Sequence, residues 1–421
     1  MYYRAIVQIE VAAMKRNSLK RRVLFVAFLL GLFVYDSAGG QLPPGAVASF
    51  YYDEQGRVIR QEKDTNGDGK IDLWIYYNKE GRVERVEKDI NFDGKPDVWI
   101  SYEGGQPKRQ EVSSNQDGRI DAWLYFNDKG EIERKEVSTK GDGKPHLWEF
   151  YQNRQLLRKE EDTQGDGRVD RITHFGDGRI SRIEEDTKGN GKMDTFSYFE
   201  NGQLVRKEVD RKYNGKIDLW GYYEAAQLIR QEEDLNGDGK PDRIVYFRNG
   251  EVVLREEDGR GQGRIDLVET FSHGQLVKRL VDSKGSGKLD ALYLFKDGKL
   301  IREERDTDGD GYFDLRIFYE NEQLLRNEAD TNRDHRVDVW AFYKDGKLVR
   351  QDEDLNFNGR ISARYYFKDG NVIKEEKVAD EEPWAPSDLF SSVQEELNRM
   401  ISEVPGIKRA ERIAIKEGQE G

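Results

Sequence analysis

Hydrophobic and polar residues alternate along most of this chain, in short segments that return about every 24 residues. In a strand, successive side chains point to opposite faces, so a segment such as 73–77 (LWIYY) predicts a strand with two distinct faces. Several of these segments are followed by a residue pair such as Asn249-Gly250. Such a pair predicts a two-residue hairpin turn, because both turn positions need a positive φ. Another alternating segment comes next, as in 203–210. One repeat is therefore predicted to be strand, tight turn, strand and acidic loop.

The repeat is regular enough to be numbered from its acidic loop, with Asp64 as position 1 of the loop DTNGDGKID (64–72). Position 1 recurs thirteen times up to residue 354, and position 6 is Gly in twelve repeats, with His335 as the exception. Position 14 is aromatic in all thirteen, and position 11 holds six of the seven tryptophans. At a period of two, positions 8, 10, 12 and 14 share one face of a strand and position 11 lies on the other.

These patterns predict an all-β protein, an elongated antiparallel β-hairpin repeat array between residues 48 and 378, solenoid-like or a superhelical sheet. A single hairpin is marginally stable in water, whereas hairpins in series can pair edge to edge and stack into one body. A β-propeller is disfavoured because one acidic loop per two strands leaves no four-stranded blade in a repeat. A coiled β-helix with one turn per repeat is a further alternative.

The two ends of the chain depart from the repeat. Basic residues before an apolar run at 23–35 predict a signal peptide over residues 1–40, with Met14 as an alternative start and an uncleaved membrane anchor as the other interpretation. Residues 41–47 form a linker. In the tail 379–421, apolar residues at helical spacing predict a short amphipathic C-terminal helix over 388–403. This helix would cover the last strand or dock to a partner. From the predicted signal peptide we expect an exported protein, in the periplasm, at the cell surface or secreted.

Composition narrows the classes of function. The net charge of −13 provides no basic face for phosphates, so a nucleic-acid partner is not expected. The chain has no cysteine, which excludes disulfides and thiolate metal sites. The 21 Tyr, 19 Phe and 7 Trp argue against disorder despite the polarity of the chain.

The acidic loops carry the candidate chemistry. Calcium prefers six to eight oxygen ligands, and positions 1, 3, 5 and 9 can supply side-chain oxygens while position 7 supplies a backbone carbonyl. Close carboxylates repel one another, by about 4 kcal/mol for a pair at 4 Å and an effective dielectric near 20, and a divalent ion would cancel this repulsion. Side-chain-to-backbone hydrogen bonds alone are the alternative. Five loops have Asp or Asn at all four side-chain positions, and their predicted ligands are Asp64, Asn66, Asp68, Lys70 and Asp72; Asp89, Asn91, Asp93, Lys95 and Asp97; Asp234, Asn236, Asp238, Lys240 and Asp242; Asp306, Asp308, Asp310, Tyr312 and Asp314; and Asp330, Asn332, Asp334, Arg336 and Asp338.

Position 3 is basic in five other loops, where it carries Lys140, Lys188, Lys212, Arg260 and Lys284. A cation at a ligand position disfavours calcium. We hypothesise that these side chains act as built-in counter-ions that keep the loop shape without metal, so that Lys188→Asn would create calcium affinity.

The sequence resembles two kinds of known repeat. DTNGDGKID (64–72), DLNGDGKPD (234–242) and DTDGDGYFD (306–314) resemble the calcium loops of thrombospondin type 3 repeats, dockerins and FG-GAP blades. YFENGQLVRKE (198–208) resembles the hairpins of MORN-type repeats. The loops imply calcium binding outside the cytoplasm, and the hairpins imply a scaffold or binding surface. Neither resemblance implies catalysis.

Several further features bear on function. The four histidines stand at different positions in different repeats, so no catalytic pair is predicted and we expect no enzyme. A basic residue usually stands four before each loop and an acid two before it, either as a solvated face or in contact with an aromatic ring. We expect a calcium-stiffened scaffold that contacts other proteins or its own copies. The alternative is a carbohydrate-binding or adhesin-like surface that uses the aromatic rows, and exposed tryptophans at position 11 would favour it.

Overall fold

The computed structural model describes residues 47–378. The predicted signal peptide, almost all of the linker and the predicted C-terminal helix lie outside this range. The chain forms two compact units, which divide between Gly202 and Gln203, and each unit is described separately. Both consist of antiparallel strands joined in chain order, and no residue from 47 to 378 is helical.

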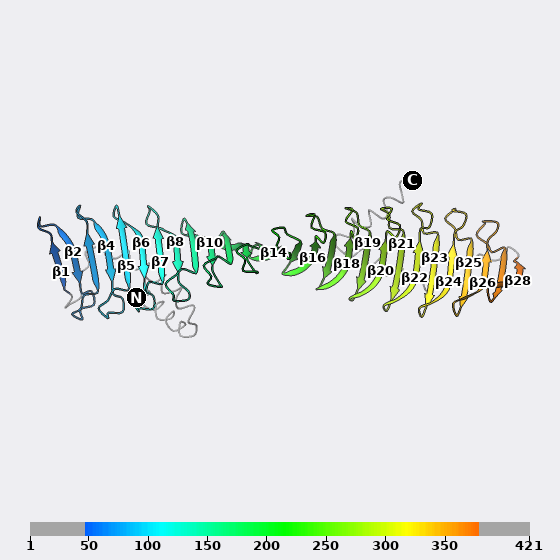
Figure 1. The fold of residues 1–421 in the computed structure, drawn as a ribbon, viewed down its shortest axis with the longest axis horizontal. Helices are drawn as coiled ribbons and strands as arrows, with labels where there is room; N and C mark the ends of the chain where they lie inside the picture. The colour runs from blue at the N-terminus through cyan, green and yellow to red at the C-terminus, as the bar shows by residue number, and fades with distance from the viewer. Residues whose placement is uncertain (1–46, 379–421) are drawn as a thin grey trace, which may run out of the picture. The chain divides into compact units, whose positions relative to one another are not determined.

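Unit 1 contains thirteen strands, which lie side by side in sequence order (Figure 1). They are β1 (Ala48–Tyr52), β2 (Val58–Lys63), β3 (Leu73–Tyr77), β4 (Val83–Lys88), β5 (Val98–Glu103), β6 (Gln106–Val112), β7 (Ala122–Phe126), β8 (Ile132–Val137), β9 (Leu147–Gln152), β10 (Gln155–Glu161), β11 (Arg171–Gly176), β12 (Arg179–Glu185) and β13 (Thr195–Glu200).

Unit 2 continues the same order with fifteen strands. They are β14 (Gln203–Val209), β15 (Leu219–Glu224), β16 (Gln227–Glu233), β17 (Arg243–Arg248), β18 (Glu251–Glu257), β19 (Leu267–Ser272), β20 (Gln275–Val281), β21 (Ala291–Lys296), β22 (Lys299–Arg305), β23 (Leu315–Glu320), β24 (Gln323–Ala329), β25 (Val339–Lys344), β26 (Lys347–Glu353), β27 (Ala363–Lys368) and β28 (Asn371–Lys377). The predicted all-β, antiparallel hairpin repeat is therefore confirmed.

The strand register confirms the predicted faces. In the β2–β3–β4 ladder, Trp74 lies opposite Glu62 and Glu87, whereas Ile75 lies opposite other residues, among them Val86. Residues directly opposite each other in an antiparallel pair share a face, so Trp74 and Ile75 face opposite sides of the sheet. Most hairpins also contain a bulge between positions 13 and 14, as between Tyr76 and Tyr77.

The turns follow the predicted chemistry. Asn249 and Gly250 join β17 to β18 and have φ values of 51° and 81°. Both are in the left-handed region that a two-residue hairpin turn requires, and Asn and Gly tolerate this region best. The aspartate-glycine turn at 345–346 has the same conformation, with φ of 51° and 75°.

The face of positions 10, 12 and 14 carries both apolar and charged side chains. In unit 1 it forms a core that includes Val98, Ile100 and Leu124. In unit 2 one of its buried side chains is a glutamate. Glu269, on β19, is almost fully buried and pairs with Arg255 and Arg279, each at 2.7 Å. A buried carboxylate without such partners would be costly, so these pairs are required by the burial.

The acidic loops are hydrogen bonded to one another as well as to the strands. The Asp72 N–H, at position 9, donates to the Lys63 carbonyl at 3.0 Å, which closes its own loop. The Asp89 N–H, at position 1 of the next loop, donates to the Asp72 carbonyl at 2.9 Å. The same bond recurs further along the chain. Consecutive loops within a unit are therefore neighbours along one edge.

Candidate metal centre in the acidic loops

Where position 1 is aspartate, its carboxylate organises the backbone of the loop. Asp64 is 1% exposed, and its two carboxylate oxygens accept the N–H groups of Gly67 at 2.6 Å and Gly69 at 2.8 Å. Gly69, at position 6, has a φ of 89°, in the left-handed region. The turn thus aims two backbone donors at one buried anion.

The aspartate at position 9 closes the loop from the other side. Asp72 accepts the backbone N–H of Thr65 at 2.9 Å and its hydroxyl at 2.8 Å. Positions 3 and 5 form a smaller turn, in which the Asn66 side-chain oxygen accepts the Asp68 N–H at 2.9 Å and Asp68 accepts the Lys70 N–H at 2.8 Å. Every predicted ligand side chain of this loop therefore bonds within the loop.

The other four predicted loops repeat this arrangement. The position-1 carboxylates of Asp89, Asp234, Asp306 and Asp330 each accept two backbone N–H groups. The position-7 residues Lys95, Lys240, Tyr312 and Arg336 each donate an N–H to the acid at position 5. The side-chain oxygens of Asn91, Asn236 and Asn332 accept the position-5 N–H, and Asp97, Asp242, Asp314 and Asp338 accept the position-2 N–H. No N–H donor to the position-7 carbonyls, which are predicted as ligands, is found among the loop contacts of residues 47–378 given above.

Loops with a cation at position 3 have the same shape. Asp186 accepts the N–H groups of Gly189 at 2.7 Å and Gly191 at 2.6 Å, although position 3 of this loop is Lys188. Asp282 accepts the Gly287 N–H at 2.7 Å. The loop conformation is therefore maintained by side-chain-to-backbone hydrogen bonds whether or not position 3 offers an oxygen.

The position-3 cations bind the loop that follows them. The Lys212 ammonium donates to the carbonyls of Asp234 at 3.3 Å and Leu235 at 3.2 Å. Lys284 makes the same contacts to the carbonyls of Asp306 at 2.7 Å and Thr307 at 3.0 Å. In these two repeats the cation therefore contacts the next loop, and the effect of the position-3 cations on calcium affinity stays a prediction. These contacts also link consecutive repeats.

The pKa values of the loop acids reflect these contacts. Burial alone would raise the pKa of Asp234, but the N–H donors of Gly239 and Gly237, together with nearby Lys212, leave its pKa below the ordinary value. Asp97 differs. Burial raises its pKa, N–H donors oppose the rise, and the charges of Asp89 and Asp93 add to it. A cation beside Asp97 would relieve this repulsion.

Among residues 47–378, the loop 306–314 brings three carboxylates together most closely. Oxygens of Asp306, Asp308 and Asp310 lie within 4.8 Å of one another. Asp306 is buried and its two oxygens accept the N–H groups of Gly309 and Gly311. Hard carboxylate oxygens are the ligands that calcium and magnesium prefer, so the donor set fits such a cation.

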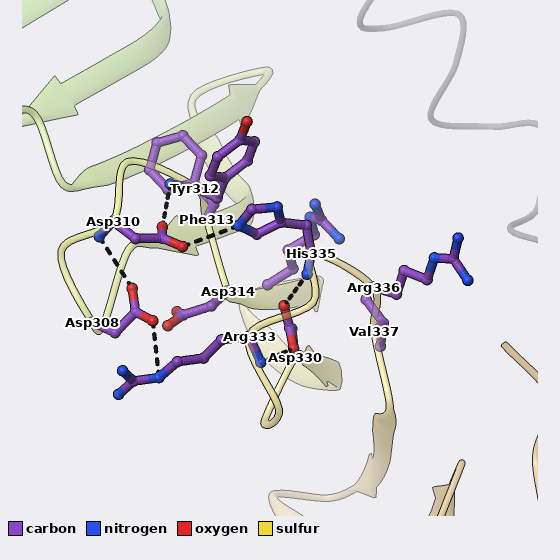
Figure 2. A pocket seen from close by; sticks show the side chains of 11 residues that line it. Asp308, Asp310, Tyr312, Phe313, Asp314, Asp330, Arg333, His335, Arg336 and Val337 are labelled. Carbon is purple, nitrogen blue, oxygen red and sulfur yellow. Dashed lines mark hydrogen bonds and ion pairs between the residues drawn. The ribbon is translucent and has the colours of Figure 1, made fainter. Parts of the chain in front are cut away.

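The next loop brings an arginine and a histidine side chain to the same acids (Figure 2). Arg333 pairs with Asp308 at 3.1 Å, and His335 Nε2 lies 3.1 Å from an Asp310 oxygen. The His335 ring also stacks on Tyr312, with ring centroids 3.8 Å apart. These side chains border a cavity of about 50 Å³.

Arg333 occupies position 4, where eight loops have glycine, and His335 occupies position 6, where the twelve other loops have glycine. Their φ values are 65° and 67°, whereas Gly309 and Gly311 hold the corresponding positions in the preceding loop. A bulky residue in this region is strained. The sequence analysis assigned no role to His335, although its replacement of an otherwise constant glycine was the signal that could have identified it.

A second group of side-chain contacts lies on the face that carries the tryptophans. Arg350 lies 3.9 Å from the Phe342 ring centroid and pairs with Asp352 at 3.2 Å. Arg85 lies 4.2 Å from the Tyr76 ring centroid and pairs with Glu87 at 3.2 Å. The basic residues before the loops thus contact aromatic rings as well as acids, rather than forming only a solvated face.

The histidines have separate surroundings. His146 lies 3.4 Å from Asp142, His174 lies 2.7 Å from Glu184, and His273 lies 3.1 Å from the Ser272 hydroxyl. His335 contacts Asp310, as described above.

Within residues 47–378, no helix has the length and apolar character to cross a membrane.

No protein-family model and no curated protein matches this sequence. Among solved structures, accessory secretory protein 1, 2 and 3 of Streptococcus pneumoniae is 15% identical, with 28% of this chain and 19% of that chain covered and a TM-score of 0.14. A TcdB2–TccC3 structure without its hypervariable C-terminal region is 13% identical, with 80% and 19% covered and a TM-score of 0.17. This chain thus spans 19% of the length of either structure, and such TM-scores support no conclusion about function.

Proposed function

We propose that this chain is an exported calcium-binding repeat protein that acts as a structural or protein-interaction scaffold. The observation that carries the proposal is the convergence of Asp306, Asp308 and Asp310 within 4.8 Å, in one of the loops that recur along the edge of each unit. Bound calcium would neutralise these acids. The strands would supply a long surface for other proteins or further copies of the chain.

The loop contacts set the expected strength of binding. In each of the five loops the predicted ligand side chains already accept backbone N–H groups, so calcium competes for their lone pairs instead of filling a ready-made cage. Isolated extracellular calcium modules bind at about 10⁻⁴–10⁻³ M, and we expect affinities in or below this class. Such sites fill in millimolar calcium and empty in chelator. Calcium would therefore stiffen the scaffold rather than switch it.

The tryptophans do not favour the carbohydrate-binding alternative. Trp74, Trp99, Trp123, Trp148 and Trp220 are half-buried, and Trp340 is buried. A sugar-stacking platform needs an open ring face, whereas the ring at 340 is covered. Packing of these side chains within the sheet supports the scaffold interpretation.

Calcium titration of the full chain tests the proposal. We expect a rise in the thermal unfolding temperature with millimolar calcium, reversed by chelator, and binding heat in calorimetry. Asp310→Asn should reduce both. Asp166→Asn is the matched control, because Asp166 is also an exposed position-5 acid that accepts one N–H, from Arg168 at 2.9 Å.

A melting temperature and a calorimetric trace that calcium leaves unchanged would refute the calcium part of the proposal. Equal effects of Asp310→Asn and its control would refute the placement of the site in loop 306–314. Magnesium titration in parallel identifies the ion, because magnesium demands a stricter octahedral geometry and retains its water more strongly.

A further inference from the structure

The first and last strands expose apolar side chains that the equivalent interior strands cover. On β1, Phe50 and Tyr52 are 48% and 59% exposed, whereas Ile75 and Tyr77 at the same positions of β3 are half-buried. On β28, Val372 is 53% exposed, whereas Leu348 at the same position of β26 is half-buried. Among the strands described here, β1 pairs only with β2 and β28 only with β27. Each therefore lies at an outer edge of its own unit (Figure 1).

The two edges are complementary under the rules of the repeat itself. Inside a unit, the second strand of one hairpin pairs with the first strand of the next, as Arg350 pairs with Tyr366 and Asp352 with Arg364. Within residues 47–378, β28 is a second strand that has no following first strand, and β1 is a first strand that has no preceding second strand. Applied to these edges, the same register places Lys374 opposite Tyr51, and Glu376 opposite Ser49.

The side chains at these positions fit the interior pattern. Interior Tyr125 lies between two arginines, Arg109 at 5.7 Å and Arg134 at 4.0 Å from its ring centroid. Tyr51 has the following arginine, Arg60, at 4.2 Å, and in the described residues no cation from a preceding strand. Lys374 would supply it.

The charges on β28 do not block pairing in this architecture. Charged residues often protect a sheet edge from association. Here, however, the segment 374–377 (KEEK) has the same character as the segment 350–353 (RQDE) of β26, which pairs on both sides. Charge at these positions is therefore part of the pairing pattern.

We propose that β28 of one copy of this chain pairs antiparallel with β1 of a second copy and continues the sheet from one molecule to the next. The contact is heterologous, so it does not close on itself and can propagate. The inference deepens the proposed scaffold function by naming one partner, and it does not depend on calcium. Exposed apolar surface at both edges supplies the driving force.

Cysteine cross-linking tests the register directly, because the chain has no native cysteine. The full-length double variant Ser49→Cys/Glu376→Cys should form a ladder of disulfide-linked multimers under mild oxidation, since directly opposite residues bring Cα atoms to about 4.5–5.5 Å. The control Ser49→Cys/Glu375→Cys shifts one partner by a residue, to the other face of the sheet, and should cross-link far less. Equal ladders, no ladder, or only an intramolecular link would overturn the proposal.

Association in solution gives a second, independent measurement. Sedimentation velocity across a concentration series should show assembly of the wild-type chain. Tyr51→Lys and Lys374→Glu should each weaken it by about tenfold. A mixture of the two variants should regain dimers, because each retains the edge that the other lacks. Lys79→Glu, at an exposed turn, is the charge-matched control and should not change assembly.

Circular dichroism of each variant excludes misfolding as the cause of lost assembly. A wild-type chain that stays monomeric at all concentrations, with β28 amides protected from hydrogen exchange, would overturn the inference, because its own residues would then cover that edge. Repeating the series in chelator separates the two proposals. Calcium-dependent melting without assembly refutes only the copy-to-copy pairing, and assembly without a calcium response refutes only the calcium site.

Discussion

Replacing Asp234 with alanine should destabilise unit 2 through the backbone of a single loop. The buried carboxylate accepts the N–H groups of Gly237 at 2.5 Å and Gly239 at 2.7 Å. Alanine offers no acceptor, so the N–H groups of both glycines lose their hydrogen-bond partner in the folded loop. Removing one side of a hydrogen bond costs the desolvation of the other side.

The expected magnitude follows from these two bonds. Hydrogen bonds to a charged group contribute about 1.5–3 kcal/mol each. Gly239 is exposed and Gly237 is half-buried, so water replaces part of the loss. We therefore expect a decrease of about 2–4 kcal/mol in the free energy of unfolding. Asp238→Ala is the matched control, because Asp238 is exposed and accepts the Lys240 N–H at 2.8 Å, and it should cost less than about 1 kcal/mol.

Guanidinium denaturation in chelator measures this difference without a contribution from calcium. Repeat arrays can open locally, so hydrogen exchange at Gly237 and Gly239 should accompany the global measurement. We expect faster exchange at both glycines in Asp234→Ala only. Equal unfolding free energies for Asp234→Ala and Asp238→Ala would refute the role of the position-1 carboxylate as the organiser of the loop.

Three further predictions concern other contacts of the same repeats. Because the folded state lowers the pKa of Asp234, its carboxylate stabilises the fold above the unfolded pKa near 4, and this contribution should decline as the pH falls below about 4. Urea denaturation over that pH range should show that the free energy of unfolding depends less steeply on pH in Asp234→Asn than in the wild type. A double-mutant cycle with Arg350→Met and Phe342→Leu should give a coupling energy of about 0.5–1 kcal/mol, and a coupling near zero would contradict the cation–π contact. Arg333→Gly/His335→Gly removes both side chains that contact the preceding acids, so calorimetry should show calcium affinity rising by about 3–10-fold, and unchanged affinity would show that these side chains do not compete with the ion.

The repeat architecture was largely predictable from the sequence. Alternation in segments such as 73–77 predicts strands, and Asn249-Gly250 predicts a turn with two positive φ values, because both signals depend on neighbouring residues only. The separation of Trp74 and Ile75 onto opposite faces follows from the same period of two. The acidic loops were recognisable as single units for the same reason.

The partners of the loop side chains were not predictable in this way. The spacing of Asp64, Asn66 and Asp68 suggested three oxygens directed at one ion, whereas in the structure each of them bonds within the loop backbone or to a neighbour in the loop. A spacing in sequence describes which groups are near, but the dihedral angles of the turn decide where each oxygen points. Several N–H groups compete with an ion for the same lone pairs.

Contacts between repeats depended on the tertiary structure alone. Lys212 reaches the carbonyl of Asp234, and His335 reaches Asp310, across 22 and 25 residues of chain. Antiparallel pairing brings consecutive loops side by side, so a side chain near the tip of one loop meets the next or the previous one. The sequence by itself determined the strands, the turns and their faces, because these depend on local backbone preferences and a period of two. Which cation neutralises which carboxylate was decided only when the strand register set the distance between loops.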